Sequence, residues 1–226
     1  MQNKKLISST VINLFIFVAS IAVIISYFFG NLSPEVDTPV QKFNFFTTDS
    51  NLLAALASLS VGIGNILILK GKLDRLPHAI IVFKLMGVVS LLLTCITVMV
   101  LLIPIYGAKM QLGGTAFHMH LGAPLLSLIS FVFLDGFGKI KLRNALWGPL
   151  PMMIYGAVYL WQVVVIGFKN GGWFDFYALN QNGKWYLSLI IMTSGTLALS
   201  IITLLLHNIF IKKSNKTNKS SDSLEK

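Results

Sequence analysis

The chain has 226 residues, of which 55% are hydrophobic and 12% are charged, and its formal net charge is +10. Soluble globular proteins carry charge on about a quarter of their residues, so this composition excludes the ordinary soluble classes and indicates an integral membrane protein. The single cysteine, Cys95, lies in an apolar run, which excludes disulfides within the chain and cysteine-based metal clusters. The excess of basic residues also occurs in nucleic-acid-binding proteins, so the positions of the charges matter.

Six stretches without Asp, Glu, Lys or Arg are long enough to cross a membrane as helices. A transmembrane helix needs roughly 20 residues to cross about 30 Å of hydrocarbon. The stretches are continuously apolar and do not alternate with a period of two, which excludes a β-barrel. The first is too long for a signal-peptide core and is interpreted as a retained span. The sequence therefore predicts an all-α, polytopic protein with one domain over residues 1–211 and the spans Leu6–Phe29, Leu52–Leu69, Leu85–Tyr106, Met110–Leu134, Ala145–Phe168 and Trp185–Ile211.

The Lys and Arg residues between the spans lie mostly on one side of the predicted membrane. Thirteen belong to the side that holds both termini, and four, Lys42, Lys109, Lys169 and Lys184, belong to the other side. By the positive-inside rule, both termini are expected in the cytoplasm, in a multi-pass protein of the cell membrane. The basic excess is thus a topology signal, and no nucleic-acid partner is expected.

Two further segments carry expectations of their own. Residues 212–226 are polar and charged with almost nothing to bury, so they are predicted to form a disordered basic cytoplasmic tail. Lys84 lies a turn or two inside the third span, where its side chain is expected to reach back to the interface, with a buried ion pair as the alternative. Within the second span, Ala54, Ser58 and Gly62 are spaced so that another helix can approach closely.

The second span opens with a cluster of polar side chains in the sequence FFTTDSN. Such residues are favoured at helix N-termini, because they satisfy free backbone amides and complement the helix dipole. Capping needs only one or two of them, so a polar site near the membrane surface is the alternative interpretation. The cluster consists of Thr47, Thr48, Asp49, Ser50 and Asn51.

The fourth span carries two histidines and a proline in the sequence HMHLGAP. Successive helical residues turn by about 100°, so His118 and His120 point away from each other and are not expected to form a metal site. Pro124 has no amide hydrogen, so the helix should kink where the carbonyl of His120 loses its partner. His120 is then either a group that exchanges protons near the outer surface or a hydrogen-bonded packing residue.

The last outer loop reads KNGGWFDFYALNQNGKWY and is rich in aromatic residues, including Trp173. An aromatic belt at the membrane interface is the common reason for such residues, and a lid over a lipid-facing cavity is the alternative. The chain has no Gly-rich phosphate loop, no GxSxG turn and no HExxH helix. No cofactor or metal is therefore predicted, and nucleotide-driven work is not expected.

At these residues the sequence resembles the six-span FAR-17a/androgen-induced-gene-like family of membrane proteins and its bacterial relatives, over residues 40–180. The similarity comprises an aromatic-aromatic-Thr-x-x-Ser-Asn motif, a His-x-x-x-Pro motif, two tyrosines in the fifth span and a Gly-Trp-aromatic loop. These are Phe45, Phe46, Thr47, Ser50 and Asn51; His120 and Pro124; Tyr155 and Tyr159; and Gly172, Trp173 and Phe174.

In animal members of that family, the corresponding Thr and His are the functional pair of a hydrolase that cleaves fatty acid esters of hydroxy fatty acids. The resemblance therefore implies a lipid-ester hydrolase in which Thr47 is the nucleophile and His120 the general base. Asp49 is expected to orient the imidazole. Amides of the second helix or the side chains of Ser50 and Asn51 are expected to stabilise the oxyanion.

His118 and Trp173 complete the set of candidate supporting residues. Two alternatives remain open. A carrier or binding protein would use the same cavity for a lipid or small solute without chemistry, and a scaffold would use these polar residues only for packing and capping.

Overall fold

A computed structural model describes residues 2–29 and 39–224, and every regular element in those two ranges is helical. Most of the first outer loop, residues 30–38, lies outside this part of the chain. The helices are α1 (Gln2–Phe29), η1 (Pro39–Asn44), α2 (Phe46–Leu69), α3 (His78–Thr97), η2 (Val98–Leu102), α4 (Ile103–Tyr106), α5 (Ala108–Leu112), α6 (Thr115–Phe117), η3 (His118–Gly122), α7 (Ala123–Ile129), η4 (Ser130–Leu134), η5 (Leu142–Trp147), α8 (Leu150–Leu160), η6 (Trp161–Ile166), η7 (Phe168–Asn170), η8 (Gln181–Gly183) and α9 (Trp185–Leu224).

Six of the helical stretches in the described residues are long and apolar enough to cross a membrane, as the sequence predicted. The second and third begin earlier than predicted, because Asp49 and Lys84, the charged residues that precede the predicted uncharged runs, both lie inside helices. The spans are Asn3–Phe29, Phe46–Leu69, His78–Tyr106, Thr115–Leu134, Leu142–Ile166 and Trp185–Lys212.

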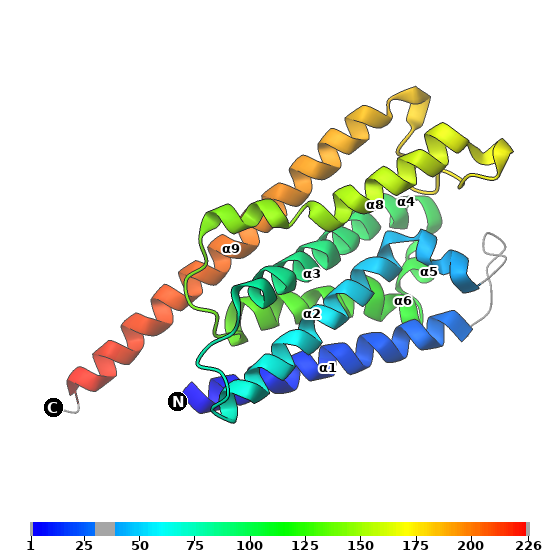
Figure 1. The fold of residues 1–226 in the computed structure, drawn as a ribbon. Coiled ribbons are helices and arrows are strands. Elements are labelled where there is room, and N and C mark those ends of the chain that lie inside the picture. The colour runs from blue at the N-terminus through cyan, green and yellow to red at the C-terminus, as the bar shows by residue number, and fades with distance from the viewer. Residues whose placement is uncertain (1, 30–38, 225–226) are drawn as a thin grey trace.

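The six spans form an elongated bundle in which α3 is central (Figure 1). The first three spans pack in chain order, α1 on α2 and α2 on α3, and the fourth packs on both α1 and α3. The last two spans, containing α8 and α9, lie along the other side of α3. The backbone of α9 continues as a helix to Leu224, through most of the segment predicted as a disordered tail.

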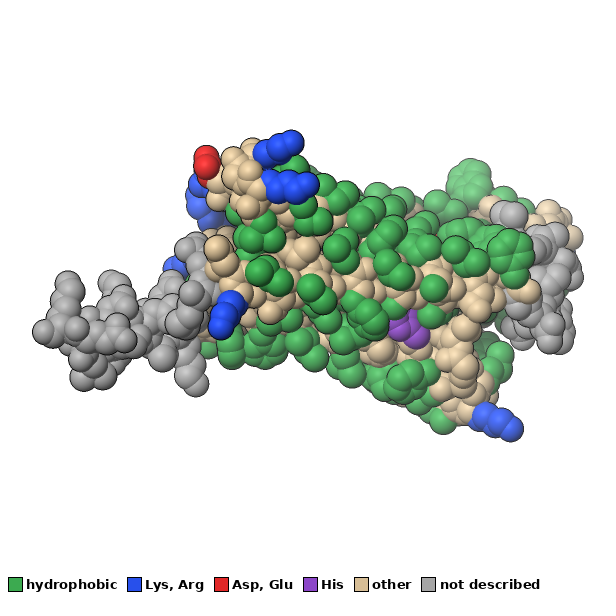
Figure 2. All heavy atoms as spheres, turned by 90° about the horizontal axis from the view of Figure 1, so that it is seen from below, with side chains coloured by type: hydrophobic (Ala, Val, Ile, Leu, Met, Phe, Trp, Pro, Cys, Tyr) green, Lys and Arg blue, Asp and Glu red, His purple; other side chains and the backbone are tan. Residues whose placement is uncertain are grey.

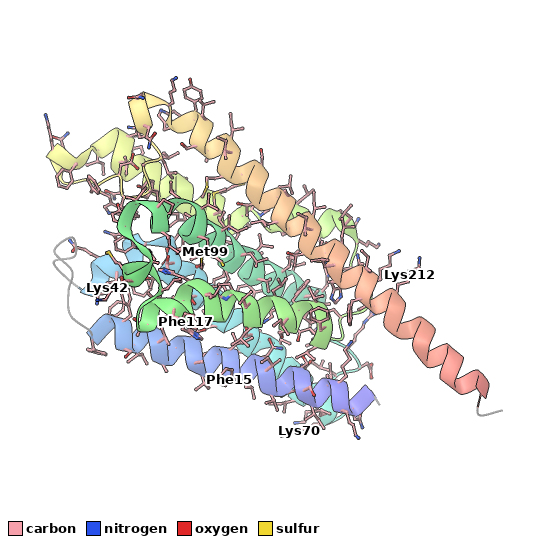
Figure 3. The ribbon with its side chains drawn as sticks, turned by 180° about the vertical axis from the view of Figure 1, so that it is seen from behind. Phe15, Lys42, Lys70, Met99, Phe117 and Lys212 are labelled. Atoms are coloured by element: carbon pink, nitrogen blue, oxygen red, sulfur yellow. The ribbon has the colours of Figure 1, made fainter. Side chains whose placement is uncertain are left out.

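Charged and apolar side chains are separated along the bundle. The face in Figure 2 is mostly hydrophobic along its middle, and Lys and Arg side chains gather towards one end. Many large apolar side chains point outwards, as Phe15 does on α1 with 56% of its surface exposed (Figure 3). Lys42 lies at the end opposite Lys70, and the two ends of the bundle are called the Lys42 end and the Lys70 end below.

Two of the spans contain a π-helical turn just before a proline. The segment η2 ends two residues before Pro104, and η3 ends two residues before Pro124. A proline ring clashes with the carbonyl four residues earlier and supplies no amide proton, so the wider π turn accommodates it. In η3 the amide of Ala123 bonds to the carbonyl of His118, five residues back. The interruption predicted ahead of Pro124 thus takes the form of a π turn.

The close helix approach predicted for the second span is confirmed at Ala54. A Cβ atom on Gly87 of α3 would lie 2.9 Å from the Cα atom of Ala54, so the two backbones are in contact. Gly62, two turns further along α2, faces Leu14 of α1 in the same way, with its Cβ position 2.8 Å from the leucine Cδ2. The small residues therefore let α2 pack tightly against both of its neighbours.

The contact between Ala54 and Gly87 supports a stability prediction. Gly87→Ala should lower the free energy of unfolding by about 1–3 kcal/mol, because the new methyl group pushes two packed helices apart. Gly195 of α9 has no atom within 4 Å of its Cβ position, so Gly195→Ala should be neutral or stabilising through helix propensity. Thermal unfolding of the purified protein in detergent measures both. Equal transition temperatures for the two variants would contradict the close contact.

A cluster of buried polar groups joins the first, second and fourth spans near the Lys70 end. Asp135, which is 1% exposed, accepts hydrogen bonds at Oδ1 from Ser9 (2.5 Å), Asn13 (2.7 Å) and Ser130 (3.1 Å). Asn65 of α2 donates to Ser9. These five residues are called the Asp135 cluster.

The expected position of Lys84 at the interface is wrong. Its side chain is 1% exposed, and its ammonium donates to Ser58 Oγ at 2.8 Å. Burial raises the pKa of Asp135, while the positive charge of Lys84 and the donors on the carboxylate oppose that rise. Lys84 is thus retained inside the bundle by a hydroxyl partner and by the charge of Asp135.

Candidate functional site

A cavity of about 230 Å³ lies at the Lys42 end, between the start of α2, the fourth span and the last loop. Thr47 and His120 both line it, so the structure brings the two main candidates of the sequence to one cavity. The other lining residues include Tyr27, Thr48, Leu102, Tyr106, Gln111, Met119, Phe176 and Tyr177. This space is called the Thr47–His120 cavity.

The first turn of α2 positions Thr47. The helix begins directly after Phe45, whose backbone is extended and whose side chain makes no cap. The backbone amide of Phe46 donates instead to the hydroxyl of Tyr177, 3.2 Å away in the last loop. Thr48 Oγ1 donates to the carbonyl of Lys42 at 2.7 Å, which fixes the preceding turn. The polar cluster therefore lies inside the helix, and its members do not act as the N-cap.

Ser50 and Asn51 hydrogen-bond to the backbone of Thr47. They do not line the Thr47–His120 cavity. Both donate to the carbonyl of Thr47, Ser50 Oγ at 3.1 Å and Asn51 Nδ2 at 2.8 Å. Asn51 Nδ2 also donates to the carbonyl of Met119 at 3.1 Å, which fastens α2 to η3. The second and fourth spans thus pack side by side at the level of the site, and these two residues have a positioning role.

His120 is buried and lies in the π turn η3. Its Nδ1 lies 2.6 Å from the carbonyl oxygen of Gln111. A carbonyl only accepts hydrogen bonds, so Nδ1 carries the proton and Nε2 of the neutral ring has the free lone pair. The ring is therefore held in the tautomer that a general base needs. Between Thr47 and His120 the described structure contains no direct hydrogen bond, and the cavity is several times larger than the roughly 30 Å³ of one water molecule.

The structure places the other candidates away from this cavity. His118 points to α1, where its Nε2 lies 3.2 Å from Ser20 Oγ, as expected for a residue on the face opposite His120. Asp49 and Trp173 line a different cavity of about 370 Å³ that faces α8. The carbonyl of Gln111, and not the carboxylate of Asp49, is the group bonded to the imidazole.

The last loop closes over the site through a network that the sequence analysis missed. Tyr159 Oη donates to Asp175 Oδ1 at 2.8 Å, and the same carboxylate accepts the amides of Leu179 and Asn180. The amide of Tyr177 donates to the Tyr159 hydroxyl at 3.1 Å. This network turns the loop inwards, so that Phe176 and Tyr177 line the cavity.

Tyr177 brings a hydroxyl to the nucleophile candidate. Besides accepting from the amide of Phe46, this hydroxyl interacts with the side chain of Thr47. Burial raises the pKa of Tyr177 far above its ordinary value, so the phenol keeps its proton and can donate it in a hydrogen bond. Tyr177 lies about 130 residues from Thr47 in the sequence. The aromatic character of the loop was the only feature of the sequence that pointed to this contact.

A second, mostly apolar cavity of about 50 Å³ adjoins the first. It lies among the third, fifth and sixth spans and is lined by residues such as Val98, Leu101, Met152, Leu160, Leu189 and Met192. Thr47, Leu102 and Tyr177 line both spaces. The hydroxyl of Thr47 therefore stands where a polar cavity with a histidine meets a narrow apolar one.

Comparison with known proteins adds no family to this description: no family model, curated protein or solved structure matches the chain. Among the described residues, no three His, Cys, Asp or Glu side chains lie close enough together to hold a metal ion.

Proposed function

We propose that the protein is a membrane-embedded hydrolase of lipid esters, in which Thr47 is the nucleophile and His120 the general base. The observation that carries this proposal is that the two residues, from separate spans, line one cavity, with the histidine in the base tautomer. The resemblance to the FAR-17a/androgen-induced-gene-like family implies the same pair.

The reaction would proceed in two steps. Thr47 Oγ1 attacks the ester carbonyl carbon, its proton passes to Nε2 of His120 directly or through one water, and the alcohol leaves with that proton. Water then attacks the acyl-threonine, again giving a proton to His120, and release of the fatty acid restores the Thr47 hydroxyl. The net change is one ester and one water converted to one acid and one alcohol.

Tyr177 is the residue best placed to stabilise the oxyanion of the tetrahedral intermediate. Its protonated hydroxyl interacts with the Thr47 side chain, and Tyr177 lines both cavities. A donor that is positioned before the reaction stabilises developing negative charge without reorganisation. Ser50 and Asn51, the donors expected from the sequence, are engaged with backbone carbonyls instead.

The apolar cavity supports a lipid as the substrate class of the proposed hydrolase. An acyl chain would enter between the third, fifth and sixth spans, where the lining is mostly aliphatic, and place its ester beside Thr47. With the Lys70 end in the cytoplasm, as the positive-inside rule predicts, the ester would lie near the outer surface of the cell membrane. The substrate would then reach the site from the outer leaflet.

Covalent labelling tests the nucleophile. A fluorophosphonate probe should label the purified wild-type protein at Thr47, because an activated hydroxyl displaces fluoride from phosphorus. Thr47→Val should abolish labelling, and Thr47→Ser should retain it. Thr97 lines only the apolar cavity, so Thr97→Val is the matched control and should label normally. Mass spectrometry of the labelled peptide identifies the site.

The same experiment separates the alternatives. A lipid carrier that uses these cavities without chemistry would take up lipid and remain unlabelled, and so would a scaffold. Labelling that persists in Thr47→Val would remove Thr47 from the mechanism.

A further inference from the structure

We infer that the cavity at the Lys70 end is a binding site for the phosphate-bearing headgroup of an anionic phospholipid. This cavity, of about 820 Å³, lies at the opposite end of the bundle from Thr47. It is built by the start of α1, the end of α2, the loop before α3 with the first turn of α3, and the segment from the end of η4 into the first turn of η5. It is called the basic cavity.

Five cationic side chains line the basic cavity, against one carboxylate, that of Asp74. They come from three separate parts of the chain and are Lys5, Arg75, Lys139, Lys141 and Arg143. Within the described part of the chain, none of these five side chains forms a hydrogen bond or an ion pair. Several unpaired cations that converge on one concave surface attract an anion with several hydrogen-bond acceptors, such as a phosphate group.

Neutral donors accompany these charges. Asn144 is only 5% exposed and lines the cavity, yet no hydrogen bond engages its side-chain amide within the described residues. Its amide atoms are not fully enclosed by protein, so they are open to the cavity and can bond a ligand or water there. Pro77 and His78, where the 20-residue helix α3 begins, also line the cavity. The first-turn amides and the dipole of that helix add to the attraction for an anion.

The rest of the lining is apolar, and this favours a lipid over a soluble phosphate. Leu6, Ile68, Leu76, Ile81 and Phe137 lie beside the basic residues. A glycerol backbone and the first carbons of acyl chains would cover this surface, whereas inorganic phosphate would leave it bare. The cavity lies where the first four spans end, which is the depth of a headgroup in the membrane.

The basic residues at this end also act as a topology signal, so the test must separate a site from diffuse attraction. Lys70 and Lys72 lie at the same end and are exposed, but they do not line the cavity. The double variant Lys70→Gln/Lys72→Gln therefore removes as much charge as Lys141→Gln/Arg143→Gln without touching the site. Asn144→Leu removes the buried amide and no charge.

Native mass spectrometry measures lipid binding. The full-length protein is held in detergent micelles that contain phosphatidylglycerol or phosphatidylcholine. Wild type should retain one phosphatidylglycerol, with a clear preference over phosphatidylcholine. Lys141→Gln/Arg143→Gln should weaken that affinity by about tenfold or more, from about 1 kcal/mol for each basic residue at a membrane surface. Asn144→Leu should also weaken it, while Lys70→Gln/Lys72→Gln should change it by less than about twofold.

Three results would overturn the inference. Equal losses in the two double variants would show diffuse attraction, and unchanged affinity in Asn144→Leu would show that the cavity is not occupied. If glycerol phosphate competes for the site as well as the lipid does, the ligand is a soluble phosphate and not a lipid. Thermal unfolding of each variant confirms that the fold is retained.

Discussion

Replacing His120 with glutamine should lower kcat/KM for a lipid ester by about 10²–10⁴-fold, the usual contribution of a general base. Glutamine is close to histidine in size and can keep a donor to the Gln111 carbonyl, but it has no nitrogen that accepts a proton at neutral pH. The loss should appear mainly in kcat, because the base acts on the transition state more than on substrate binding. Release of fatty acid from a long-chain ester in detergent or nanodiscs measures it.

His118 supplies the matched control for this experiment. It lies two residues away in the same π turn but faces Ser20 and does not line the Thr47–His120 cavity. His118→Gln should therefore keep wild-type activity to within a few fold. An enzyme that loses as much activity through His118→Gln as through His120→Gln would show a general effect on the fold and would refute the assignment of the base.

Asp135→Leu should destabilise the protein by about 3–5 kcal/mol, the usual cost of leaving a buried charge uncompensated. The substitution leaves the ammonium of Lys84 buried without an opposite charge, and it leaves the donors of Ser9, Asn13 and Ser130 without their shared acceptor. Thermal or denaturant-induced unfolding in detergent measures the loss. Asp74, which is exposed near the same end, is the control, and Asp74→Leu should change stability by less than about 1 kcal/mol.

The double variant Asp135→Leu/Lys84→Met sharpens this prediction. With both charges removed, the uncompensated ammonium is gone, so the double variant should be more stable than Asp135→Leu alone. Strictly additive losses would show that the two side chains do not influence each other.

The sequence predicted the spans well, because a long uncharged run admits few structures in a membrane. Charge was a poor guide to where a helix begins. Asp49 lies in the first turn of α2, where the helix dipole favours a carboxylate, and Lys84 is buried. The length of an uncharged run is therefore shorter than the helix when a charged residue of that helix packs inside the bundle.

The site could be predicted only in part. Patterns within one helix showed that His118 and His120 face opposite ways and that Pro124 interrupts the fourth span, and the structure agrees on both points. The groups that contact Thr47 and His120 come from segments that are distant in the sequence. No local pattern shows that the carbonyl of Gln111 fixes the imidazole or that Tyr177 reaches Thr47.

The Asp135 cluster has a consequence for how the protein is made. If the helices enter the membrane in chain order, Asn13, Asn65 and Lys84 are inserted before Asp135 has been synthesised. Polar groups that face hydrocarbon are unfavourable, and Ser9 and Asn13 lack their acceptor, and Lys84 lacks an opposite charge, until the fourth span arrives. The carboxylate that ends the fourth span then satisfies α1 directly and α2 through Ser9. A chain that ends before residue 135 would therefore leave the polar groups of α1 without their shared acceptor.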